Sequence, residues 1–136
     1  MPLQGCRALV AEDQTLVLLD IADILTAAGA KIVGPATSVR KAMQYAQFEP
    51  FDCAVLDVML RDGYIFPVAD LARQKGKGIV FVTGVPHTPE LKARWPEAEI
   101  LSKPAAAADL IRAVSNACKA VRSEDRPQEA VPGENS

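Results

Sequence analysis

The chain of 136 residues contains no long uninterrupted apolar run. Its longest apolar stretch, residues 16–25, is broken by Asp20 and Asp23, whereas a helix that crosses a bilayer needs about 20 mainly apolar residues. The N-terminus also lacks a basic region followed by an apolar segment, which a secretory signal requires. The sequence therefore predicts a cytoplasmic protein that makes no contact with membranes.

Positive charge is not concentrated anywhere in the sequence. The 15 Lys and Arg residues are scattered among 17 Asp and Glu residues, and the formal net charge is -2. Proteins that bind nucleic acid typically carry a basic patch or stripe. We therefore expect no direct binding of DNA or RNA.

Cysteine is scarce, with only Cys6, Cys53 and Cys118 in the chain. Three cysteines that lie far apart do not resemble the even-numbered framework of a disulfide-rich domain. We expect all three to be reduced, inert residues of the core.

What the sequence does contain is an alternation of short apolar segments with segments of helical period. The expected strands are residues 7–11, 31–34, 53–56, 79–82 and a strand that begins at residue 100. The expected helices are residues 15–28, a helix capped by Ser38 that ends before Pro50, one from Pro67 to before Gly76, a short one near 90–95, and 107–121. Nearly continuous apolar strands between helices favour a parallel sheet covered on both faces, so the fold class is α/β.

The length of the chain is suited to one domain, which we place at residues 5–121. Residues 122–136 lose all periodicity and gather Pro, Glu, Asn and Gly. Such a segment cannot bury enough apolar surface to offset the entropy lost on ordering. It is predicted to be a disordered C-terminal tail.

Polar side chains follow four of the five expected strands. Glu12 and Asp13 follow the first strand, Asp57 the third, Thr83 ends the fourth, and Lys103 follows the fifth. In sheets of this kind ligands bind beyond the carboxyl ends of the strands, so these side chains are expected to meet. Carboxylates suit Mg²⁺, and a hydroxyl and an ammonium can hold phosphoryl oxygens. The combination predicts a site that accepts phosphate.

Each of these features also has an ordinary structural interpretation. An acidic pair is favoured at a helix N-terminus by the helix dipole, and Asp57 and Thr83 could be turn residues. Lys103 could be a solvated surface charge. Their joint occurrence at the ends of successive strands is what favours the functional interpretation.

In these motifs the sequence resembles the receiver domain of two-component response regulators, over roughly residues 5 to 121. The resemblance implies a doubly wound (βα)5 flavodoxin-like sandwich with strand order 2-1-3-4-5. It also implies that Asp57 accepts a phosphoryl group from a histidine kinase or phosphotransfer protein, with Thr83 and Lys103 contacting that group. Mg²⁺ would be bound by Glu12, Asp13, Asp57 and the backbone carbonyl of Met59.

The same resemblance implies a cis peptide bond before Pro104, and it also brings out two departures. Receivers usually have Tyr or Phe where this chain has Ile100, and an aromatic residue where it has Ala105. The usual aromatic switch therefore cannot operate. The run Phe81-Val82-Thr83-Gly84 is similar to the Phe-Ala-Thr-Gly stretch of stand-alone receivers that work with HWE-type histidine kinases.

The leading interpretation is thus a signalling phosphoacceptor without an attached output domain, and not an enzyme beyond promoting its own phosphorylation and dephosphorylation. One alternative is a phosphatase of the haloacid dehalogenase type. That class needs a second Asp two residues after the nucleophile, where this chain has Met59. The other alternative is a receiver-like interaction module that is never phosphorylated.

Overall fold

The computed structural model describes residues 1–84 and 88–119. Its main sheet has five parallel strands in the order β2-β1-β3-β6-β7. Their bounds are β1 (Arg7–Ala11), β2 (Lys31–Ala36), β3 (Cys53–Leu56), β6 (Gly78–Thr83) and β7 (Glu99–Ser102). Counted along the chain, this is the order 2-1-3-4-5, so the predicted topology is confirmed.

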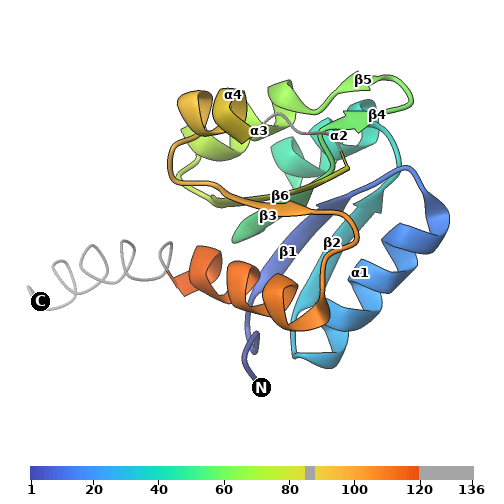
Figure 1. Ribbon diagram of the computed structural model, residues 1–136, viewed down its shortest axis with the longest axis vertical. Coiled ribbons are helices and arrows are strands. Elements are labelled where there is room, and N and C mark those ends of the chain that lie inside the picture. Colours follow the sequence, from blue (N-terminus) through green and yellow to red (C-terminus); the bar gives the residue numbers. More distant parts are fainter. Residues whose placement is uncertain (85–87, 120–136) are drawn as a thin grey trace, which may run out of the picture.

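Helices cover both faces of this sheet (Figure 1). One face carries α1 (Thr15–Ala27) and a last helix, whose described part is residues 107–119. The other face carries α2 (Val39–Phe48), α3 (Phe66–Gln74) and the short α4 (Thr88–Arg94). The fold is therefore doubly wound, as predicted for strands that are nearly continuous in apolar residues.

The sheet separates two hydrophobic clusters. Successive residues of β1 alternate between them: Ala8 and Val10 pack toward α1 and the last helix, and Leu9 and Ala11 pack toward α2 and α3. All four residues of β3 are buried. A strand with a core on each side has no solvent face, which explains why its sequence shows no polar alternation.

The folded core includes residues that precede the predicted start of the domain at residue 5. The core begins before residue 5, because Leu3 is buried and its N–H donates to the Ala28 carbonyl oxygen at 2.9 Å. The predicted tail, residues 122–136, lies outside the described residues. Within residues 1–84 and 88–119, no helix is long and apolar enough to span a membrane.

A small hairpin follows Asp57, in the segment between the expected strand at residues 53–56 and the expected helix that begins at Pro67. It pairs β4 (Met59–Leu60) with β5 (Gly63–Tyr64) in antiparallel fashion. Its turn places the Asp62 carboxylate at the start of α2, where it accepts hydrogen bonds from Val39 N–H at 2.8 Å and Arg40 N–H at 3.1 Å. Ser38 Oγ accepts from Lys41 N–H at 3.1 Å, as predicted for the helix cap. These bonds satisfy three N–H groups that a helix start leaves without partners.

We expect Asp62→Ala to destabilise the fold in a pH-dependent way. The hydrogen bond from Val39 N–H is the main reason that the pKa of Asp62 lies below its ordinary value of 3.8. A lowered folded-state pKa contributes stability above the ordinary pKa, and that contribution is lost as the pH falls through the folded value. The free energy of unfolding, measured with urea, should therefore be clearly lower for the variant than for the wild type at pH 7. This difference in free energy should become smaller below pH 3.8. A difference that stays constant with pH would contradict this assignment.

The expectation that all three cysteines are reduced is wrong for two of them. Cys6 and Cys118 form a disulfide with a Cα–Cα distance of 6.2 Å, and Cys53 alone is a free, buried thiol. The two paired residues are 112 positions apart in the sequence. Only the docking of the last helix beside the start of β1 brings them together, so their spacing could not predict the pair.

Candidate functional site

The three predicted acidic residues meet at the carboxyl edge of the sheet. Glu12 and Asp13 follow β1, and Asp57 follows β3, which is hydrogen-bonded to β1. Each contributes a carboxylate oxygen to a group in which all the atoms lie within 4.8 Å of one another. Glu12 is 1% exposed and Asp57 is 8% exposed, whereas Asp13 is partly exposed. The cluster therefore opens to solvent on the side of Asp13.

Lys103 brings an ammonium group to this cluster. Its Nζ lies 2.7 Å from Glu12 Oε1 and 3.1 Å from Asp57 Oδ2. The second oxygen of Glu12, Oε2, accepts a hydrogen bond from Gln14 N–H at 3.0 Å. Glu12 is thus held in place by two partners, and Lys103 links the carboxylates that follow β1 and β3.

The surroundings of this ion pair shift the pKa of both partners. Burial raises the pKa of Glu12 and the Asp57 charge adds to the rise, whereas the hydrogen bonds from Lys103 and Gln14 N–H lower it; the net shift is upward. Burial alone would lower the pKa of Lys103, but the hydrogen bonds to Glu12 and Asp57 and their charges outweigh burial and raise it. Lys103 therefore remains an ammonium that can hold anionic oxygens.

The remaining predicted site residues surround this cluster. Thr83 is the last residue of β6 and is buried, and its carbonyl oxygen accepts from Lys103 N–H at 3.0 Å. Met59 begins β4, two residues after Asp57, with its side chain half exposed. The Lys103–Pro104 peptide bond is cis, as predicted.

Sequence reasoning missed one residue at the mouth of the site. The Arg61 guanidinium, from the turn of the β4–β5 hairpin, donates through Nη2 to the Asp13 carbonyl oxygen at 3.4 Å. The contact depends on the hairpin, whose short strands have no clear pattern of their own.

The donor set fits magnesium. It consists of oxygens only, and its three carboxylates outnumber the single ammonium of Lys103, so a divalent cation would offset the remaining negative charge. Magnesium commonly uses one or two protein carboxylates and keeps several waters. Glu12, Asp13 and Asp57 are the residues that would hold it, with the Met59 carbonyl as a further predicted ligand.

The position that usually carries the switch aromatic in receivers is filled by Ile100, on β7. It is partly buried, faces Phe81 across the β6–β7 pair, and packs against the hydrophobic cluster that includes Trp95. A β-branched side chain has few χ1 states between which it could switch. Ala105 packs against the opposite cluster.

Comparison with known proteins agrees with this geometry. No family model matches the chain. The transcriptional regulatory protein PdtaR of Mycobacterium tuberculosis is 31% identical over 121 residues, 85% of this chain and 58% of that protein. The structure superposes on a response regulator receiver protein from Sinorhizobium medicae with a TM-score of 0.79 at 29% identity, covering 88% of this chain and 98% of the other.

A CheY-like response regulator receiver domain protein from Methanospirillum hungatei also matches, with a TM-score of 0.77, 20% identity, and coverage of 88% and 98% of the two chains. At that identity the likeness shows the fold alone. Together with the fold and the site, the comparisons show that the chain is similar, in structure and in sequence, to the receiver domains of two-component response regulators. It spans little more than half the length of PdtaR.

Proposed function

We propose that this receiver takes a phosphoryl group from a histidine kinase, or from a phosphotransfer protein, onto Asp57 in a magnesium-dependent reaction. The observation that carries the proposal is the convergence of three carboxylates within 4.8 Å, with Lys103 Nζ bridging Glu12 and Asp57. The phosphorylated chain would then signal through contacts with another protein.

The residues present support each part of this chemistry. An Asp57 carboxylate oxygen forms a bond to phosphorus while the bond from phosphorus to the donor nitrogen breaks. Bound magnesium supplies neutralisation of the charge on the phosphoryl oxygens. Lys103, whose Nζ lies 3.1 Å from Asp57 Oδ2, would hold one phosphoryl oxygen, and Thr83, at the end of the adjacent β6, would contact another.

The kinase partner is proposed from the sequence. Phe81-Val82-Thr83-Gly84 is similar to the corresponding stretch of receivers that work with HWE-type histidine kinases, and Ile100 is consistent with that group because it lacks the switch aromatic. We propose a kinase of this type as the donor. Incubation with purified kinases of several classes tests this choice, because phosphate should transfer fastest from the HWE-type enzymes.

A labelling experiment separates the three functional interpretations. The protein is incubated with acetyl phosphate, with and without magnesium, and acyl phosphate and released phosphate are both measured. A receiver accumulates acyl phosphate only when magnesium is present. Continuous release of phosphate from a substrate such as p-nitrophenyl phosphate would indicate a phosphatase, and neither signal would indicate a module that is never phosphorylated.

We expect Asp13→Ala to weaken magnesium binding strongly and to slow phosphorylation. Asp13 is the most exposed carboxylate of the cluster and has no ammonium partner in the described structure, so its charge is free for the metal. Affinity should fall at least about tenfold, since even an outer-shell partner of a metal ligand is worth that much. Isothermal titration with magnesium measures the change.

Glu12→Ala should have a milder effect on magnesium affinity, because Glu12 is already engaged by Lys103 and Gln14 N–H. Asp109→Asn is the matched control, since Asp109 is an exposed carboxylate whose side chain contacts Arg112 away from the site. It should bind magnesium as the wild type does. If Glu12→Ala lost more magnesium affinity than Asp13→Ala, the proposed order of importance of these two ligands would be reversed.

A further inference from the structure

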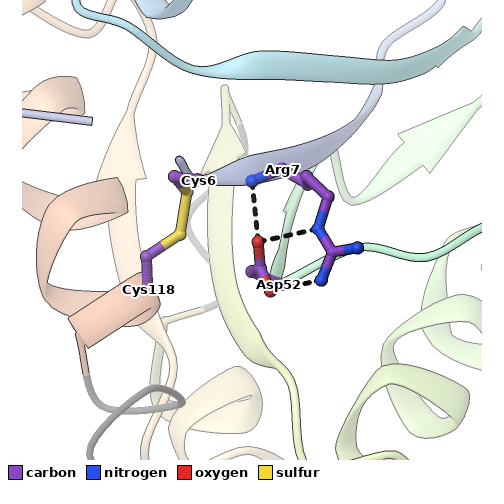
Figure 2. A network of polar contacts seen from close by, with 4 residues as sticks. All are labelled: Cys6, Arg7, Asp52 and Cys118. Carbon is purple, nitrogen blue, oxygen red and sulfur yellow. Dashed lines mark hydrogen bonds and ion pairs between the residues drawn. A yellow bond between two sulfur atoms is a disulfide. The ribbon is translucent and has the colours of Figure 1, made fainter. Parts of the chain in front are cut away.

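All three cysteines of the chain meet in one place, although they come from three different elements. Cys6 directly precedes β1, Cys53 begins β3, and Cys118 lies in the last helix. Their sulfur atoms all lie within 4.8 Å of one another, and none of the three residues is more than 3% exposed. Figure 2 shows the Cys6–Cys118 disulfide running from the start of β1 to the last helix.

The disulfide attaches the second half of the last helix, in which the buried side chains are small. After Leu110, the buried residues of this helix are Ala113, Val114, Ala117 and Cys118, and Ile111 is partly buried against the same cluster. Burial stabilises in proportion to apolar area, so alanine side chains contribute little. The helix nevertheless lies close to the sheet, because a Cβ added at Gly78 would be 2.6 Å from the Ala117 Cβ.

Polar contacts do not make up for this small apolar area. Arg112 Nη1 lies 3.8 Å from Glu99 Oε1, and Asn116 Nδ2 donates to Glu99 Oε2 at 3.3 Å. Both contacts are exposed, and exposed ion pairs contribute little to stability. In this half of the helix the covalent link is therefore the main attachment to the start of β1.

We propose that Cys6 and Cys118 form a reversible thiol–disulfide site, and that its redox state controls how firmly the second half of the last helix is attached to the sheet. The reaction partner is a dithiol. One thiolate of the dithiol attacks a sulfur of the Cys6–Cys118 bond and forms a mixed disulfide, and the displaced protein sulfur takes a proton. The second thiol of the dithiol then closes its own disulfide, so two electrons and two protons pass to Cys6 and Cys118.

Cys53 is close enough to exchange with this disulfide, but its surroundings keep it out of the reaction. Burial, with a smaller contribution from the Asp52 charge, raises the pKa of Cys53 to about 12. Only the thiolate attacks a disulfide, and at neutral pH almost none is present. Reoxidation of the folded chain should therefore restore the Cys6–Cys118 pair and leave Cys53 free.

Reduction has to proceed through a local opening, because both sulfurs of the disulfide are buried. The last helix is the element that can open, since its second half has few large buried side chains. Val114→Ala removes the largest of them. This variant should be reduced faster than the wild type at the same concentration of dithiothreitol.

The test uses the full chain, purified without reductant and then treated with dithiothreitol. Free thiols counted after a denaturing quench should rise from one to three, the two new ones coming from Cys6 and Cys118. Amide hydrogen exchange over residues 107–119 should accelerate by at least about tenfold, which corresponds to about 1.4 kcal/mol of local stability. Amides of the central strands β3 and β6 exchange through global unfolding, so their exchange should accelerate only as far as the loss of total stability measured by urea unfolding requires.

Two variants complete the experiment. In Cys118→Ala, amide hydrogen exchange over residues 107–119 should be fast with or without dithiothreitol. In Cys53→Ala, dithiothreitol should accelerate this exchange as much as it does in the wild type. Three free thiols in the untreated protein, or one free thiol that persists in dithiothreitol, would overturn the proposal. Complete reduction with unchanged exchange in the last helix would overturn it as well, and these outcomes need only the wild-type protein.

Discussion

The Asp57→Asn variant is expected to accept no phosphoryl group from a kinase or from acetyl phosphate. Asparagine keeps the shape of the side chain but removes the charge that makes the oxygen a nucleophile and that pairs with Lys103 at 3.1 Å. Glu12 should not replace it, because Glu12 is buried and already paired with Lys103 and Gln14 N–H. Asp13 should not replace it either, because among the described residues no ammonium group pairs with Asp13 as Lys103 pairs with Asp57. Acyl phosphate detected by mass spectrometry should fall from a clear signal to none.

Asp62→Asn is the matched control for this loss. Asp62 is an exposed carboxylate five positions further along the chain, and its hydrogen bonds are to the start of α2. It should be phosphorylated at the wild-type level once folding has been verified by circular dichroism. Labelling of Asp57→Asn at another residue would show that the nucleophile is assigned to the wrong carboxylate.

Loss of the Cys6–Cys118 disulfide is expected to be the largest single change in stability. The bond closes a loop of 112 residues, and in the chain-entropy model a loop of roughly 100 residues corresponds to about 4.7 kcal/mol. That is a large share of the 5–15 kcal/mol that is typical of folded domains. Urea unfolding of the oxidised and reduced protein at 25 °C measures the difference.

A double-mutant cycle separates the bond from the side chains that make it. Cys6→Ala and Cys118→Ala should each remove most of the unfolding free energy that the disulfide contributes. The double variant should lower the free energy of unfolding only a little more than either single variant does. Neither single variant should respond further to reductant. If the losses of unfolding free energy in the two single variants added up in the double variant, the two cysteines would act as independent core residues with no covalent bond between them.

Much of the fold could be predicted from local patterns in the sequence. Strands with two buried faces are continuous in apolar residues, as in Cys53 to Leu56, and this indicates a parallel sheet. The site residues could be predicted for the same reason. Carboxyl ends of parallel strands share one edge of the sheet, so Asp13 and Asp57 must lie near each other once the strand order is known.

The sequence by itself thus determined the fold class and the acidic cluster, because apolar periodicity and the residues at strand ends are local properties, whereas the strand order was implied by the resemblance to receiver domains. Tertiary structure alone decided the partners of several side chains: Lys103 with Glu12, Asp62 with the start of α2, and Cys6 with Cys118. Each of these contacts joins segments whose distance in space depends on how helices and turns pack against the sheet. The physical reason is that contact between distant residues follows from the packing of whole elements, which no single segment encodes.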